Sequence, residues 1–171
     1  MDHFRRGAEL MAVLTQAIML SLSGYIPDGI DRIPTMTGST TSGVTASASA
    51  ASGNAWKTGD NSTGTEWSTG VTGYFWLKYD FGAPKDIASY VVQGPTGTTD
   101  APKQWTFEGS NDNTNWDVLD TQGPLTWTSL QSRVFNLGGL LPKKYQYYRW
   151  NGLSGQGGVN WCRISEVELR S

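Results

Sequence analysis

The sequence is poor in cysteine and histidine, with one residue of each, Cys162 and His3, among 171. A lone cysteine cannot form an internal disulfide, so an oxidising compartment is neither required nor excluded. Because His3 lies at the N-terminus, the body of the chain offers no histidine for Ser-His-Asp or Cys-His catalysis. A zinc site built from several His or Cys ligands is excluded for the same reason.

Charge is also scarce. Only 16% of the residues are Asp, Glu, Lys or Arg, and the formal net charge is -2. The 13 basic residues are scattered along the chain and form no basic stripe. A protein that binds nucleic acid needs such a stripe to neutralise phosphates, so a nucleic-acid partner is not expected.

Small polar residues and aromatics are abundant. Gly, Ser and Thr make up about a third of the chain, beside 8 Trp, 7 Tyr and 5 Phe. This composition is typical of short strands joined by turns, and the length suits one domain with a short appendage. The sequence therefore predicts an all-β domain.

The N-terminal stretch differs from the rest. Residues 9–22 carry apolar side chains at helical spacing, and Gly24 ends the pattern. Three interpretations remain open: a secretory signal peptide, an amphipathic anchor helix that docks on another chain or self-associates, and a helix that packs within the chain. The apolar run is too short and interrupted to span a bilayer. We expect an anchor helix over 1–24, an extended linker over 25–40 and a β-domain over 41–171.

Alternating apolar and polar residues bounded by Gly, Pro and Asn predict strands in the β-domain. The expected strands are Val44–Ala48, Tyr74–Phe81, Ile87–Gln93, Gln104–Gly109, Trp116–Leu119, Arg133–Leu137, Tyr145–Asn151 and Cys162–Leu169. Eight short strands favour a β-sandwich or barrel. Large aromatic side chains gain most by burial, so a core position is expected for five tryptophans. These are Trp56, Trp67, Trp76, Trp105 and Trp116.

Five segments occur in an order that resembles a known family. They are AWKTGDNSTGTEW, WLKYDFG, APKQWTFEGSNDNTNW, YQYYRWN and ISEVEL. Together they resemble the discoidin or coagulation-factor type C domains, which include carbohydrate-binding modules and modules on phage fibres. The resemblance covers about residues 40 to 171 and implies an eight-stranded, galactose-binding-like jelly-roll β-sandwich.

The resemblance implies a structural calcium ion. Its matching ligands are the carbonyls of Lys57, Ser62 and Ser165 and the side chains of Asp60, Thr65 and Glu166. Such a set of carboxylate and neutral oxygens in a Gly-rich loop suits a hard cation. The triplet Gly59-Asp60-Asn61 departs from the aromatic-Asp-Gly usual in the family. An Asx-turn, in which Asp60 caps backbone amides without a metal, is the alternative.

The resemblance also places a glycan site in the loops at the calcium end of the sandwich. Its candidate residues are Tyr74, Asp100, Gln156, Asn160 and Trp161. Galactose-binding members usually offer a loop His and a loop Arg. This domain has no His, and Asp100 lies where an Arg is common, so galactose specificity is not expected. Plain surface loops without a ligand remain the alternative.

We therefore expect a non-catalytic glycan-binding or adhesion module. No nucleophile with a base is apparent, and most of the carboxylates fall in hydrophilic turns. A net acidic domain would also be repelled by an anionic leaflet, so phospholipid binding is not favoured. The combination of an anchor, a linker and one discoidin-like module resembles a phage virion decoration or fibre protein.

The expected partners are a cell-surface glycan and other virion or assembly proteins, the latter through residues 1–36, with self-association into a homo-oligomer as a further expectation. The expected location is the virion. A purely structural assembly protein without a ligand and a secreted carbohydrate-binding module are the alternatives.

Overall fold

The structure is a computed structural model that describes residues 28–71, 73–138, 143–156 and 161–171. The described residues form eleven strands and two short 3-10 helices. The strands are β1 (Thr40–Thr41), β2 (Val44–Ala48), β3 (Trp67–Ser68), β4 (Phe75–Asp86), β5 (Ser89–Gln93), β6 (Pro102–Ser110), β7 (Asp117–Gln122), β8 (Ser132–Asn136), β9 (Lys144–Gly155), β10 (Arg163–Ile164) and β11 (Glu166–Arg170). The helices are η1 (Ser52–Gly59) and η2 (Thr98–Asp100).

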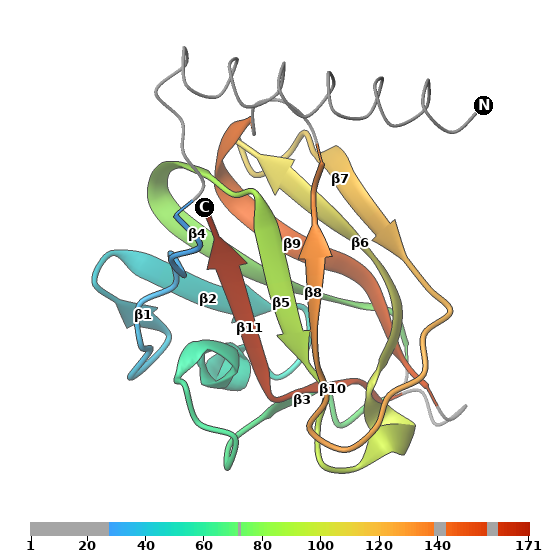
Figure 1. Cartoon of the computed structure of the whole chain (residues 1–171). Coiled ribbons are helices and arrows are strands. Elements are labelled where there is room, and N and C mark those ends of the chain that lie inside the picture. The colour runs from blue at the N-terminus through green and yellow to red at the C-terminus, as the bar shows by residue number, and fades with distance from the viewer. Residues whose placement is uncertain (1–27, 72, 139–142, 157–160) are drawn as a thin grey trace, which may run out of the picture.

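Two antiparallel sheets face each other across one core. The larger sheet has six strands in the order β1-β2-β4-β9-β6-β7, and the smaller has three in the order β11-β5-β8. Figure 1 shows the smaller sheet in front of the larger one, with η1, β3, β10 and η2 gathered at the lower end. This is the β-sandwich that the sequence predicts, and each of the eight predicted segments overlaps a strand. The predicted last strand is divided because the chain changes partner at Ser165, from β3 to β5.

The core is aromatic. Its largest buried side chains, all less than 2% exposed, include Trp67, Trp150, Tyr79, Tyr90 and Phe107. Tyr90 stacks on Phe107 with 4.2 Å between ring centroids, and its hydroxyl accepts a 2.9 Å bond from Trp105 Nε1. Each ring buries a large apolar area, so a few aromatics from both sheets fill the interior. The single cysteine, Cys162, is free and fully buried in the same core.

The prediction for the tryptophans is only partly right. Trp67 and Trp105 lie in the core, and Trp56 packs against it half-buried. Trp76 faces outward instead, because the core-facing residues of β4 are Phe75, Leu77 and their alternates. Trp116 also lies outside the core, under the Arg149 guanidinium, which is 3.8 Å from the ring centroid.

Residues 28–40, predicted as part of an extended linker, lie against the sandwich. The backbone N–H of Arg32 donates to the Leu169 carbonyl at 2.7 Å, and that of Met36 donates to the Gly59 carbonyl at 2.8 Å. Ile33 and Met36 are 4% and 1% exposed. This segment therefore contributes to the core. The predicted anchor helix over 1–24 lies outside the described residues, and neither helix in the described part is long and apolar enough to cross a membrane.

Candidate metal loop and binding end

The loop after η1 curls around Asp60. The Asp60 carboxylate accepts the Ser62 N–H at 3.0 Å and the Thr65 hydroxyl at 2.7 and 2.9 Å. Thr65 Oγ1 also lies 3.0 Å from the Ser62 carbonyl oxygen. Asn61 takes a positive φ of 58°, a conformation that Asn tolerates well. These local bonds form the Asx-turn of the sequence analysis and bring the oxygens of Asp60, Ser62 and Thr65 together.

Glu166, at the start of β11, joins this loop from the far end of the chain. Its Oε1 accepts the Ser62 N–H at 2.8 Å. Burial, and after it the adjacent Asp60 carboxyl, raises the pKa of Glu166 to about 8. Two carboxylates placed side by side repel each other. One of the two groups therefore keeps its proton unless a cation compensates both charges. The tertiary fold thus builds an acidic oxygen cluster from residues that are remote in sequence.

This cluster fits a hard cation, because Ca²⁺ takes carboxylate, carbonyl and hydroxyl oxygens together. The fold brings together Asp60, Ser62, Thr65 and Glu166. Lys57 lies in the last turn of η1 and Ser165 directly precedes Glu166, and neither makes a hydrogen bond to the loop in the described part of the chain. Among described residues no three His, Cys, Asp or Glu side chains gather, so neutral oxygens would have to complete the coordination.

The base of the loop is fixed to the core through Gly59. A Cβ at this position would meet Ile33 at 2.8 Å and the Tyr79 hydroxyl at 2.9 Å. Only glycine permits this close approach. The Tyr79 hydroxyl in turn bonds the Thr58 hydroxyl at 2.7 Å, and both side chains are buried. The loop therefore starts from a rigid anchor.

A second cluster lies at the same end of the sandwich, around Arg163 of β10. Its Nη1 donates to Glu66 Oε1 at 3.0 Å, and its Nε lies 3.3 Å from Asp100 Oδ2 without hydrogen-bond geometry. The guanidinium is 6.0 Å from the ring centroid of Trp161, which is 37% exposed. Sequence reasoning assigned Asp100 and Trp161 but missed Arg163 and Glu66. The signal was present, since Arg163 follows Trp161 by two residues.

Other predicted ligand residues lie near this end without joining the cluster. Tyr74 precedes β4 and is 75% exposed, and Val71 nearby is 54% exposed. The carbonyl oxygen of the Gln156 side chain accepts the Trp127 backbone N–H at 2.9 Å. Asn160 lies outside the described residues. Strand register places Tyr74 and Gln156 at one end, because Phe75 pairs with Leu153 across β4 and β9.

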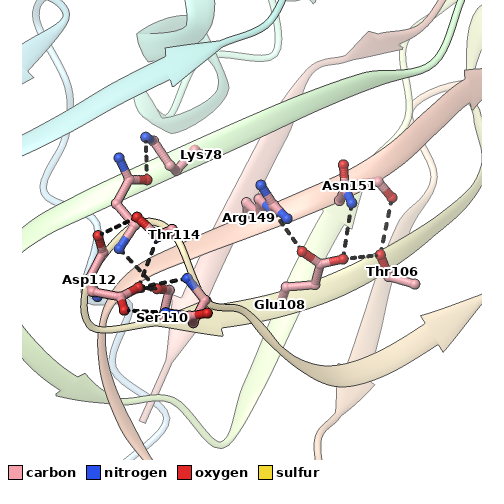
Figure 2. A network of polar contacts seen from close by, with 10 residues as sticks. Lys78, Thr106, Glu108, Ser110, Asp112, Thr114, Arg149 and Asn151 are labelled. Carbon is pink, nitrogen blue, oxygen red and sulfur yellow. Dashed lines mark hydrogen bonds and ion pairs between the residues drawn. The ribbon is translucent and has the colours of Figure 1, made fainter.

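The outer face of the six-stranded sheet holds a polar network that the sequence analysis did not anticipate. Figure 2 shows Glu108 at its centre. The carboxylate accepts bonds from Thr106 Oγ1 at 2.6 Å, Arg149 Nε at 2.6 Å and Asn151 Nδ2 at 3.0 Å. Burial opposes ionisation of Glu108, but these three donors outweigh it and hold the pKa of the carboxyl below its usual value. The negative charge of Glu108 is thus compensated within the fold.

The sandwich resembles solved carbohydrate-binding modules, although identity is low. The family 32 module of Clostridium perfringens NanJ, in complex with galactose, has 17% identity and a TM-score of 0.63, with 79% of this chain and 98% of that chain covered. A module of a C. perfringens GH89 protein, in complex with GalNAc-β-1,3-galactose, has 16% identity and a TM-score of 0.62, with coverage of 79% and 100%. A chitosan-binding module from a Paenibacillus chitosanase/glucanase has 20% identity and a TM-score of 0.59, with coverage of 75% and 96%.

No curated protein sequence matches this chain. The family model of the F5/8 type C domain matches residues 37–167, which is most of the chain. The described strands of the sandwich fall within or next to that span. The chain therefore belongs to the F5/8 type C domain family.

Proposed function

We propose that this protein is a non-catalytic glycan-binding module whose ligand site is the cluster around Arg163. The observation that carries the proposal is the placement of a guanidinium between two carboxylates and beside a partly exposed indole ring. Planar charged groups hydrogen-bond sugar hydroxyls, and an aromatic ring packs under the apolar face of a sugar. Trp161, Asp100 and Glu66 surround Arg163 in this way, with Tyr74 exposed at the same end.

The chemistry of the cluster favours recognition over catalysis. Glu66 and Asp100 form ion pairs with the Arg163 guanidinium. Glycoside hydrolysis needs one acid with a raised pKa and one base across a cleft. Among the described carboxyl groups, burial raises the pKa of Glu166 and of Asp31, and neither residue belongs to the Arg163 cluster. We therefore assign the cluster a binding role and propose no chemical step.

A glycan array probed with the full chain tests this function. We expect wild-type protein to bind at least one glycan and Arg163→Ala to lower affinity at least tenfold in a calorimetric titration. Arg170→Ala is the matched control, because Arg170 forms a similar half-exposed ion pair with Glu168 on β11, 2.6 Å apart. No binding across a broad array, or equal losses in both variants, would contradict the assignment.

We further propose that Ca²⁺ is held by the loop as a structural ion. Asp60, Thr65 and Glu166 would supply side-chain oxygens, and Ser62, with Lys57 and Ser165 as sequence-based candidates, would supply carbonyls. A divalent cation there neutralises the paired carboxylates and fixes the loop. The thermal midpoint of the full chain, measured with Ca²⁺ and with a chelator, tests this assignment.

Display on a larger assembly such as a virion is also proposed, on the sequence of the N-terminal segment alone. Because residues 28–36 pack on the sandwich, the informative deletion removes residues 1–27 rather than 1–36. The shortened chain should keep its thermal midpoint and fail to join the particle. Normal incorporation of this chain would refute an anchoring role for the segment.

A further inference from the structure

A hollow of about 320 Å³ opens on the outer face of the six-stranded sheet. Its walls come from β6, β7, β9 and the turn after β7. The lining includes Gln104, Thr106, Thr121, Pro124, Asn151 and Gly152. It shares no residue with the Arg163 cluster or the metal loop, so it is a separate feature of the fold.

Strand register extends this hollow into a row across the sheet. Trp76 pairs with Asn151, Asn151 with Thr106, and Thr106 with Thr121. Paired residues on antiparallel strands project from the same face, and neighbouring strands lie about 4.8 Å apart. The row therefore spans roughly 14 Å, from an indole ring at one end to the hollow at the other. Such a length suits an extended ligand rather than a small ion.

The groups along the row are held ready to hydrogen-bond. Glu108, of which only 6% of the side chain is exposed, holds both Thr106 and Asn151 from the adjacent position on the same face. Because Asn151 uses Nδ2 for this bond, its Oδ1 remains an acceptor. Among the residues that the structure describes, the side chains of Gln104 and Thr121 have no hydrogen-bond partner. The hollow thus combines oriented groups with unused hydrogen-bonding capacity, as a binding site requires.

Charge decides the class of ligand. None of the described residues that line the hollow carries a charge. Glu108, which contacts the lining residues Thr106 and Asn151, is paired with Arg149 at 2.6 Å. Lys78, beside the row, donates to Asn113 at 2.8 Å and lies 5.3 Å from the Trp76 ring centroid. Amides, hydroxyls and an indole without net charge match a neutral polyhydroxylated chain, whose hydroxyls need donors and acceptors and whose ring faces are apolar.

We infer that this row and hollow form a second carbohydrate-binding surface, which takes an uncharged oligosaccharide laid across β4, β9, β6 and β7. The inference goes beyond the loop-end function and does not depend on it, because no residue is shared. A module with both surfaces binds two parts of one polysaccharide or two separate polysaccharide chains.

Calorimetric titration of the full chain with cellohexaose, xylohexaose and mannohexaose tests the inference, with hexagalacturonic acid as the charged counterpart. We expect at least one neutral hexasaccharide to bind. Gln104→Ala with Thr121→Ala should lower its affinity at least tenfold, as should Trp76→Ala. The double variant removes only outward side chains, and a thermal melt verifies that each variant folds. Tyr74→Ala and Arg163→Ala, at the loop end, should leave this affinity within twofold.

Three outcomes would overturn the inference. They are no binding of any neutral hexasaccharide, tighter binding of hexagalacturonic acid than of every neutral probe, and a loss caused equally or only by the loop-end variants. If Arg163→Ala does not lower the affinity for any glycan of the array, the Arg163 cluster is not the ligand site. The losses expected for the Gln104, Thr121 and Trp76 variants with a neutral hexasaccharide would still stand, so the two proposals fail separately.

Discussion

Glu108 and Glu166 show how one residue type behaves in two regions of the same sandwich. Both are taken partly out of water, which disfavours the carboxylate. Glu108 meets Arg149, Thr106 and Asn151, and its pKa falls below the usual value. Glu166 meets the Asp60 carboxyl, and its pKa rises to about 8. On the sheet face, the charge of Glu108 is therefore balanced by residues of the fold. In the loop, the charge of Glu166 beside Asp60 must be balanced by a bound proton or a cation.

The largest expected effect comes from removing the partner of Glu108. Arg149→Ala leaves a carboxylate buried without its cation and uncovers Trp116, so we expect a loss of about 3 kcal/mol in the free energy of unfolding. Urea denaturation measures it. Arg133→Ala is the control, because Arg133 also lies over a tryptophan, 4.6 Å from the Trp127 centroid, but bonds only neutral oxygens. Similar losses of stability in Arg149→Ala and Arg133→Ala would contradict the importance of the Glu108 ion pair. The double change Arg149→Met with Glu108→Leu removes both charges and should recover most of the stability.

The second prediction concerns calcium at the loop. At a free concentration 100 times its dissociation constant, an ion that binds only the folded state adds about 2.7 kcal/mol. Wild-type protein should therefore melt at a higher temperature in Ca²⁺ than in chelator, and Glu166→Gln should abolish most of this shift. In chelator the melting temperature of Glu166→Gln should equal or exceed that of the wild type, because the repulsion between the Asp60 and Glu166 carboxyl groups is gone. Glu168→Gln, two residues along the same strand, should keep the calcium shift. An unchanged wild-type midpoint, together with no bound ion, would refute the metal assignment.

The smallest predicted effect is a pH dependence at Asp31, a third carboxyl group that is withdrawn from water. Burial raises the pKa of Asp31 to about 6, although its Oδ1 accepts the Ile33 and Leu169 N–H groups. The folded state then binds more protons than the unfolded state between pH 4 and 6, so stability falls as pH rises through this window. We expect about 1 kcal/mol after allowance for solvent screening. Asp31→Asn keeps an oxygen for both bonds and should make the fall of urea-derived stability between pH 4 and 6 less steep than in the wild type, because only the contribution of Asp31 is removed. A slope unchanged by the substitution would disprove the role of Asp31.

Much of the fold was predictable, because alternation along a strand is a local property. The segment around Trp105 and Phe107 places both on one face in the sequence, and both are buried. The error at Trp76 has an equally local cause. Both phases of YFWLKYDF are aromatic, and the prediction chose the wrong one. Lys78 and Asp80 alternate with Trp76 and so lie on the same face of the strand. Because charged side chains face solvent, the outward orientation of Trp76 could have been predicted from the sequence.

The candidate sites were less predictable, because their charges meet across the chain. Asp60 and Thr65 are close in sequence, and the family resemblance pointed to their loop. Arg163, by contrast, was missed as the neighbour of Asp100. The position of Arg163 depends on the pairing of β10 with β3, which joins segments that are far apart in the sequence. The Glu108 network was missed for the same reason. Its Arg149 lies 41 residues away, and only the register of β6 with β9 sets them opposite.

The sequence by itself determined the β-sandwich class, the positions of its main strands along the chain and the oxygen-rich composition of the loop at Asp60, because backbone alternation and turn chemistry act between near neighbours. The tertiary structure decided which carboxylate is neutralised. Whether a buried Glu meets an arginine or another acid depends on contacts between distant strands, and an electrostatic energy falls off with distance in space rather than along the chain. Contacts between segments that are distant in sequence also place residues 28–36 against the core and form the uncharged hollow beside Glu108.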